Sequence, residues 1–215
     1  MDINVSAITN AVLKAIENND LKINSDAQIP VGISNRHIHL SREHVNALFG
    51  EGYELTPAKE LSQPGQYACK EQLTIIGPSL RPIEKVRVLG PVRSESQVEI
   101  SRTDSYVLKV KPPVRESGKI KGSEKITIIG PKGVVTLNEG LIIANRHIHM
   151  SLEDAKKYNI KDNDFVTIDA ITERRTRFFD VQVRVSDKFR LEMHLDTDDA
   201  NAAALKNGDK VVLVK

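Results

Sequence analysis

Four of the six histidines lie in a seven-residue segment that occurs twice. Residues 35–41 read NRHIHLS and residues 145–151 read NRHIHMS, identical at six of seven positions with an offset of 147 − 37 = 110 residues. Residues two apart on a strand point to the same side, so His37 and His39 can converge on one point, as can His147 and His149. Two convergent imidazoles suit a zinc-like ion. Because backbone geometry does not require two histidines in a repeated turn, we predict that both pairs bind metal.

Two ligands do not hold zinc firmly, so each pair needs a further ligand from elsewhere in the chain. His194 lies in an alternating segment with Glu192 on its own face, and it can complete the second pair as a three-histidine site with an open fourth position. For the first pair the best candidate is Glu99, which alternates with the apolar Val98 and Ile100. The alternative for both residues is a solvent-facing side chain on a strand.

Arg93 and Cys69 are the other candidates for chemistry. Arg93 follows a Gly-Pro pair and is predicted on a constrained loop, which suits the bidentate binding of a phosphate; a solvated surface arginine is the alternative. Cys69 is the single cysteine, so no internal disulfide can form, and a reducing cytosolic compartment is expected. Its surroundings favour a partly buried structural thiol over a nucleophile or metal ligand.

The composition excludes several classes of partner. The 31 basic and 29 acidic residues give a net charge of +2, which does not indicate binding to nucleic acid. Aromatic residues make up 4% and tryptophan is absent, which argues against stacking platforms for single strands. No apolar run approaches the roughly 18 residues of a membrane span, and no secretory signal is expected. A chain of 215 residues can form one or two domains.

The residue pattern predicts a mainly β fold with short α-helices. Each copy of the repeat is expected to run from a strand (residues 29–34 and 141–144) through a turn that holds the histidines into a helix opened by Ser41 or Ser151. Three segments are expected to be strands that end at Gly-Pro: residues 73–78, 86–91 and 126–131. Further expected elements are mostly β structure over residues 53–110, a loop over 111–123, strands at 165–169, 178–185, 190–196 and 210–214, and a helix at 198–205. Short, closely spaced strands favour barrels over βαβ units.

Residues 1–20 are predicted to form a separate amphipathic helix. Ile8, Val12 and Ile16 follow helical spacing, and residues 21–28 are polar and predicted to be a linker. A short tethered helix is not stable alone, so it must lie against the body of the protein or against a partner.

Five stretches carry a resemblance to a known family. They are residues 35–41, 63–68, 88–104, 145–151 and 191–198. Together they resemble the PduL-type phosphate propanoyltransferases, and the likeness extends from about residue 29 to the C-terminus.

The resemblance implies two similar β-barrel domains built from discontinuous pieces, with two zinc ions at their junction. The implied bounds are residues 29–36 plus 145–215 for one domain and 37–144 for the other. The implied ligands are His37, His39 and Glu99 for the zinc that also meets the sulfur of coenzyme A, and His147, His149 and His194, with water, for the other. Arg93 is implied to bind phosphate. Members of this family often carry an N-terminal helix that directs them into bacterial microcompartments, which residues 1–20 fit.

The expected function is therefore a zinc-dependent acyltransferase that interconverts propanoyl-CoA plus phosphate with propanoyl phosphate plus CoA. The expected partners are acyl-CoA and inorganic phosphate, further copies of the chain in a homo-oligomer, and a microcompartment shell or cargo that binds residues 1–20. Nucleic acid and membranes are not expected, and the expected location is the microcompartment lumen or the cytoplasm. Which zinc holds the carbonyl and which the phosphate stays open.

Three other functions fit parts of the sequence. The ligand set alone allows a zinc-dependent thioester hydrolase, in which water takes the place of phosphate. His37, His39 and Glu43 mimic part of a cupin pattern, but the second cupin motif is missing. A non-catalytic, shell-associated binding module is the third alternative.

Overall fold

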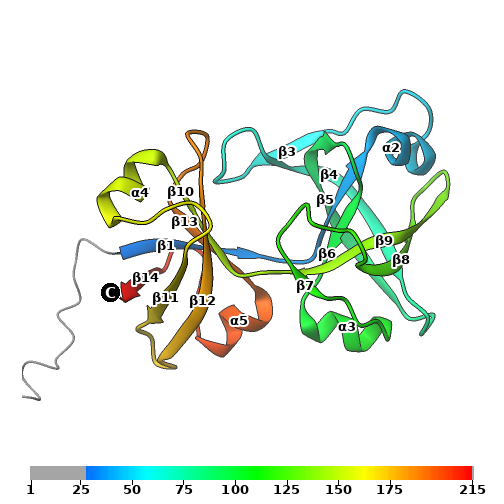
Figure 1. The fold of residues 1–215 in the computed structure, drawn as a ribbon. Coiled ribbons are helices and arrows are strands. Elements are labelled where there is room, and N and C mark those ends of the chain that lie inside the picture. Colours follow the sequence, from blue (N-terminus) through cyan, green and yellow to red (C-terminus); the bar gives the residue numbers. More distant parts are fainter. Residues whose placement is uncertain (1–27, 215) are drawn as a thin grey trace, which may run out of the picture.

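Short alternating strands close into two six-stranded barrels in the computed structural model, which describes residues 28–214 (Figure 1). The predicted N-terminal helix and all of the predicted linker except Gln28 lie outside the described residues, and Gln28 is the first residue of β1. The mainly β fold class with two similar barrels is confirmed.

Barrel one combines the first described strand with the C-terminal part of the chain. Its strands pair in the closed order β1-β13-β10-β12-β11-β14. They are β1 (Gln28–Ser34), β10 (His147–Met150), β11 (Phe165–Ala170), β12 (Thr176–Val185), β13 (Glu192–Asp196) and β14 (Lys210–Val214).

Barrel two takes the middle of the chain, and pairing of its strands closes the ring β2-β5-β4-β8-β9-β6. They are β2 (His37–Ser41), β4 (Tyr67–Ile76), β5 (Pro82–Arg93), β6 (Gln97–Glu99), β8 (Glu124–Ile129) and β9 (Val134–Ala144), with β3 (Pro57–Glu60) beside β4 and β7 (Val114–Arg115) beside β9.

The chain passes between the barrels at the two copies of the repeat. It leaves barrel one after β1, passes residues 35–36 and enters barrel two as β2 (Figure 1). It returns after β9 through residues 145–146 and enters barrel one as β10. The histidine pairs were expected in turns, but they lie on β2 and β10, directly after each crossing. Both pairs are therefore held at the junction by strand pairing rather than by a flexible turn.

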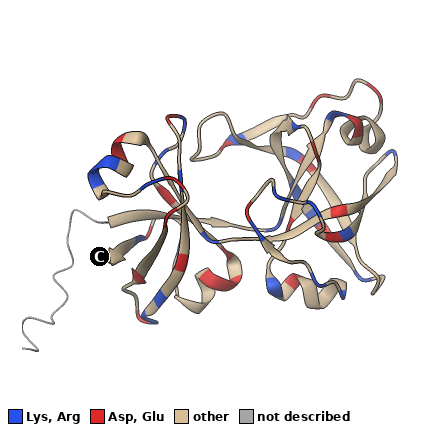
Figure 2. Cartoon of the chain, viewed as in Figure 1, with Lys and Arg blue, Asp and Glu red and all other residues tan. Residues whose placement is uncertain are grey.

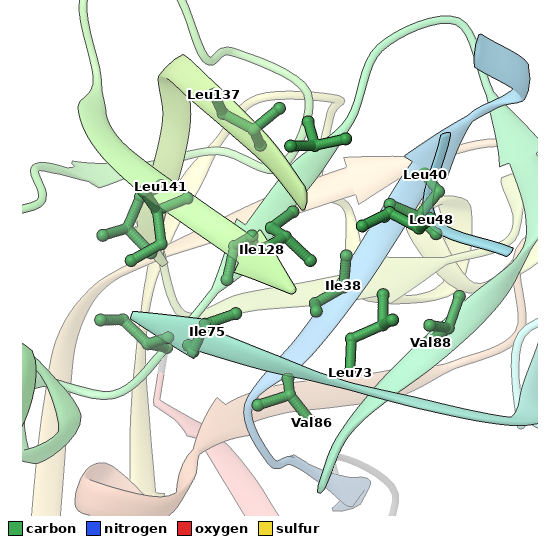
Figure 3. Packing of buried hydrophobic residues seen from close by; sticks show 14 of the residues in the cluster. Ile38, Leu40, Leu48, Leu73, Ile75, Val86, Val88, Ile128, Leu137 and Leu141 are labelled. Atoms are coloured by element: carbon green, nitrogen blue, oxygen red, sulfur yellow. The ribbon is translucent and has the colours of Figure 1, made fainter. Parts of the chain in front are cut away.

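Strand alternation decides which side chains of β2 and β10 enter the barrels. Ile38 and Leu40 are fully buried in the core of barrel two, and Figure 3 shows them among Leu73, Val88 and other apolar side chains. Ile148 occupies the corresponding place in the core of barrel one. Since neighbouring residues on a strand face opposite sides, the histidines that alternate with these apolar residues lie on the outer faces of the barrels.

Within residues 28–214, four short helices connect the strands: α2 (Arg42–Phe49), α3 (Arg102–Leu108), α4 (Leu152–Tyr158) and α5 (Thr197–Ala202). Ser41 and Ser151 cap α2 and α4 as predicted, each accepting a hydrogen bond from a backbone N–H. Helix α3 was not predicted. Its start is a capping box formed by Ser101 and Asp104, a pattern that the sequence displays within a region otherwise expected to be β.

The prediction that strands end at Gly-Pro is confirmed at two of the three positions and is wrong at the third. Strands β4 and β8 end directly before Gly77 and Gly130. Strand β5 instead continues through Gly90 to Arg93, so Arg93 lies at a strand end and not on a loop. A Cβ on Gly90 would lie 2.3 Å from the ring of Tyr67, so glycine is required there for close packing of β4 against β5 rather than for a turn.

Charge is spread over both barrels without a dominant sign. Figure 2 shows acidic and basic residues interspersed on both barrels. None of the helices within residues 28–214 is long and apolar enough to cross a membrane.

Candidate functional site

Strand register brings each histidine pair next to its predicted third partner. In barrel two, β2 runs antiparallel to β6 and places His37 opposite Glu99. In barrel one, β10 runs antiparallel to β13 and places His147 opposite His194. Residues directly opposite on antiparallel strands lie close on one face of the sheet, so each group forms on the outer face of its own barrel.

The first group consists of His37, His39 and Glu99, whose candidate ligand atoms all lie within 4.8 Å of one another. All three side chains are buried. The Nδ1 of His37 lies 2.8 Å from the carbonyl oxygen of Asn35, to which it donates in the neutral ring that keeps a lone pair on Nε2. That Nε2 lies 3.4 Å from Oε2 of Glu99.

The second group consists of His147, His149 and His194, whose candidate ligand atoms also lie within 4.8 Å of one another. The same backbone contact recurs, because Nδ1 of His147 lies 2.8 Å from the carbonyl oxygen of Asn145. The Nε2 atoms of His147 and His149 are only 3.1 Å apart. Two ring nitrogens at this distance need a proton or a cation between them.

One distance between candidate ligand atoms in each group fits a tetrahedral metal ion. Two ligands each about 2.0–2.1 Å from a tetrahedral zinc ion lie roughly 3.3 Å apart. The separations of 3.1 Å between the imidazoles of His147 and His149 and of 3.4 Å between His37 and Glu99 lie on either side of this value. In addition, Nδ1 of His149 is buried without a hydrogen-bond partner among the described residues. Three imidazoles, or two imidazoles and a carboxylate, are typical zinc donor sets.

Burial and local charge hold the second group in its neutral form. Burial, reinforced by the neighbouring His194, lowers the pKa of His147 to about 4. Burial together with His147 lowers the pKa of His149 to about 2. Both rings are therefore neutral near pH 7 and have lone pairs free for a cation.

The first group carries a compensating charge. Burial favours the neutral form of Glu99, but His37 outweighs that effect and holds the pKa of this carboxyl far below its usual range. Burial opposes protonation of His37, yet the charge and hydrogen bond of Glu99 raise its pKa. Burial and the charge of His37 push the pKa of His39 well below its ordinary value. The first group therefore has a carboxylate where the second group has a third imidazole.

Both groups face one cavity at the junction of the barrels. It is open to solvent and is lined by all six candidate ligands together with Arg93. Groups encoded 110 residues apart in sequence, at His37 and His147, thus meet in one place.

Arg93 has hydrogen-bonding capacity to spare. Its Nη1 donates to Oγ of Ser117 at 3.3 Å, and no carboxylate within residues 28–214 lies at salt-bridge distance from it. Burial lowers its pKa, against the attraction of Glu99, but leaves a guanidinium charged at neutral pH. A partly buried arginine with unused donors at a cavity wall suits an anion.

Four residues at the site were not predicted to have a role there. Arg184 and Ser117 line the cavity, and Gln97 and Glu192 each bond a candidate ligand. The signal for Gln97 and Glu192 was their position two residues before Glu99 and His194 on alternating strands. Ser117 gave no signal, because it lies in the segment predicted only as a loop.

The remaining histidine and the cysteine lie outside the cavity. His44 is on α2, where Nδ1 lies 2.6 Å from Oγ of Ser96. Cys69 is fully buried in the core of barrel two, and burial, helped by Glu71, raises the pKa of its thiol to about 11. Such a thiol is neither nucleophile nor ligand at neutral pH, which agrees with the structural role predicted for it.

Comparison with known proteins finds similarity over almost the whole chain, and the matches share one description. A family model described as phosphate propanoyltransferase matches residues 30–206. The phosphate propanoyltransferase of Thermotoga maritima is 54% identical over 209 residues, covering 97% of this chain and 99% of that protein. That of Lachnoclostridium phytofermentans is 51% identical over 213 residues, covering 99% of each. That of Clostridioides difficile is 47% identical over 206 residues, covering 96% of this chain and 98% of that protein.

Acid should destabilise the metal-free protein through the second group. His147 has a pKa of about 4 when folded and an ordinary value of 6.5 when unfolded, so between these pH values the unfolded chain binds a proton that the folded chain does not. Above pH 6.5 this histidine does not change the free energy of unfolding with pH. As the pH falls from 6.5 toward 4, the free energy of unfolding decreases by about 1.4 kcal/mol per pH unit. We expect His147→Gln to flatten the fall in unfolding free energy measured by urea denaturation, and His44→Gln to leave it unchanged. An equally steep fall in His147→Gln would contradict the burial argument.

Proposed function

Because the chain belongs to the phosphate propanoyltransferase family, and is a phosphate acyltransferase, we propose that its junction cavity transfers a propanoyl group between coenzyme A and phosphate with two metal ions. The observation that supports this proposal is the convergence of two metal-binding groups and Arg93 on one cavity. Acyl transfer to an anionic nucleophile requires cations near both reactants, and this cavity offers two candidate metal sites together with the guanidinium of Arg93.

We assign one zinc ion to each group, held by His37, His39 and Glu99 in one case and by His147, His149 and His194 in the other. When bound, zinc supplies Lewis acidity toward the thioester carbonyl and stabilises the departing thiolate. The carbonyl oxygens of Asn35 and Asn145 fix the tautomer of the first histidine in each pair, so that Nε2 is free for the ion. A divalent ion leaves the first group with one positive charge and the second with two.

The protein's part in the transfer is to bind and align the phosphate. Arg93 binds it through the guanidinium donors that Ser117 does not use, and this contact offsets its repulsion from the oxygen that becomes negative. A phosphate oxygen bonds to the carbonyl carbon, the carbon–sulfur bond breaks, and its electron pair leaves on sulfur. The proton of hydrogen phosphate ends on the thiol of coenzyme A, so the products are propanoyl phosphate and CoA.

We also propose the organisation of the chain around this site. The two catalytic domains are residues 29–36 plus 145–215 and residues 37–144, one for each barrel, and the enzyme acts as a homo-oligomer. Residues 1–20 direct it into a bacterial microcompartment, while enzyme that is not encapsulated stays in the cytoplasm. The helical spacing of Ile8, Val12 and Ile16 supports this role for the N-terminal segment.

Loss of the second group should abolish both metal binding and transfer. We expect the variant H147A/H149A to retain one of two zinc equivalents, because two of three donors are gone, and to release CoA from propanoyl-CoA at least about 100-fold more slowly. Zinc content by mass spectrometry and phosphate-dependent release of free thiol measure the two effects. His44→Ala is the control, since this ring lies outside the cavity. Release that proceeds equally well without phosphate would show a thioester hydrolase instead.

Arg93→Ala should raise the KM for phosphate by about 10–100-fold at unchanged zinc content, because the side chain binds the anion and not the metals. Arg93→Lys should recover only part of the loss, since lysine offers charge without the planar pair of donors. Initial rates at varied phosphate and fixed propanoyl-CoA measure this effect. Arg81→Ala, at an exposed position outside the cavity, provides the control. An unchanged KM for phosphate would remove Arg93 from the binding site.

Deletion of residues 1–20 should leave turnover of the purified enzyme within about twofold of the full chain, because the catalytic cavity is formed by later residues. In cells that produce microcompartments, the same deletion should move a fluorescent fusion from the compartments to the cytoplasm. Collapse of turnover on deletion would show that the segment belongs to the catalytic fold.

A further inference from the structure

One position in each barrel repeats the geometry of the other but with a different residue. In barrel two, Gln97 lies on β6 opposite His39, two residues before Glu99. In barrel one, Glu192 lies on β13 opposite His149, two residues before His194. Each of these residues shares a strand face with the third donor of its group, and each bonds that donor.

In barrel two the donor is a carboxylate and its neighbour is an amide. The Nε2 of Gln97 donates to Oε1 of Glu99 at 2.6 Å, which leaves Oε2 facing His37. Gln97 is itself fixed at both ends, because its Nε2 also donates to Oγ of Ser117 at 2.9 Å and its Oε1 accepts from the backbone N–H of Gly118 at 2.7 Å. The amide cannot rotate without losing these bonds.

In barrel one the donor is an imidazole and its neighbour is a carboxylate. Oε2 of Glu192 lies 2.6 Å from Nε2 of His194, and it also accepts from Oγ of Ser62, which comes from the other barrel. The carboxylate is packed against Gly32, where a Cβ would lie 2.9 Å from its Cδ. Glu192 does not belong to the group whose ligand atoms all lie within 4.8 Å of one another, so it supports the donor His194 and is not a metal ligand itself. A neutral ring whose Nε2 proton is held in this way keeps its lone pair on Nδ1.

We propose that Gln97 and Glu192 are positioning residues matched to their donors: an amide N–H orients the carboxylate Glu99, and a carboxylate orients the imidazole His194. This inference rests on the proposed two-metal function. It adds a matching rule, in which an amide supports a carboxylate ligand and a carboxylate supports an imidazole ligand. Partners that orient a metal ligand typically change metal affinity by about 10–100-fold when removed. The two partners are therefore not interchangeable, although they occupy the same place in the fold.

The surroundings of Gln97 allow the rule to be tested by exchange. A carboxylate at position 97 still accepts from the N–H of Gly118, and the hydroxyl of Ser117 can rotate to donate to it. Beside Glu99, however, that carboxylate repels its neighbour and no longer donates to it. Beside an imidazole at position 99, it recreates the arrangement of Glu192 and His194.

The decisive experiment is a double-mutant cycle on the first group. Zinc dissociation constants are measured by chelator competition in the full-length H147A/H149A chain, so that only the first group contributes. We expect Q97E to weaken zinc binding about 10-fold when Glu99 is present, and to strengthen it about 10-fold when it is combined with E99H. If only the added negative charge mattered, Q97E would strengthen zinc binding both with Glu99 and with E99H. Q72E, on an exposed position of β4, should change the constant by less than about twofold in either background.

A Q97E effect of the same sign in both backgrounds would overturn the matching rule. If the H147A/H149A chain binds no zinc at all while Gln97 and Glu99 are native, it is the proposed function that fails. Barrel one provides a second measurement that does not depend on E99H folding. There, E192Q should weaken one of the two zinc sites about 10-fold in the otherwise native enzyme, whereas Ser62→Ala, which keeps the carboxylate, should not. Equal effects of E192Q and Ser62→Ala would mean that Glu192 only joins the barrels.

Discussion

The structure depends on the alternation of side chains on two strands that directly follow a crossing between barrels. Ile38 and Ile148 are fully buried in the two cores, so the histidines on either side of each must face outward. A shift of register by one residue would place imidazoles in an apolar core and isoleucine in the cavity, at a cost of several kcal/mol for the buried polar rings. Hydrophobic burial therefore fixes the direction in which the candidate ligands point.

Duplication and crossing together explain why there is one cavity and not two. A histidine pair on the outer face of a single barrel would be exposed to solvent. Because residues 35–36 and 145–146 carry the chain from one barrel to the other, each pair begins at the junction, where residues of both barrels line one cavity. Polar contacts across the junction hold this arrangement, among them the reciprocal bonds between the side chain of Gln63 and the backbone of Arg190. Burial at this junction depresses the pKa values of His147 and His149.

Sequence predicted well the features that depend on local periodicity. The strands at residues 165–169 and 210–214, the helices capped by Ser41 and Ser151, and the shared direction of the two histidines in each pair all follow from patterns within a few residues. The convergence of the six candidate ligands depended on the likeness to a family, because strand pairing between distant segments cannot be deduced from one sequence. Gly90 was misinterpreted for a related reason, since its role is set by Tyr67 on another strand. Ser117 lies on an irregular loop, where no period exists to indicate its direction.

The most direct test of a two-metal cavity is anomalous X-ray diffraction at the zinc absorption edge from crystals of the full-length enzyme. A two-metal mechanism predicts two anomalous peaks in the junction cavity, one bounded by His37, His39 and Glu99 and the other by His147, His149 and His194. It is contradicted if fully active enzyme gives no peak there, or if a single peak is found with one of the two groups left without metal.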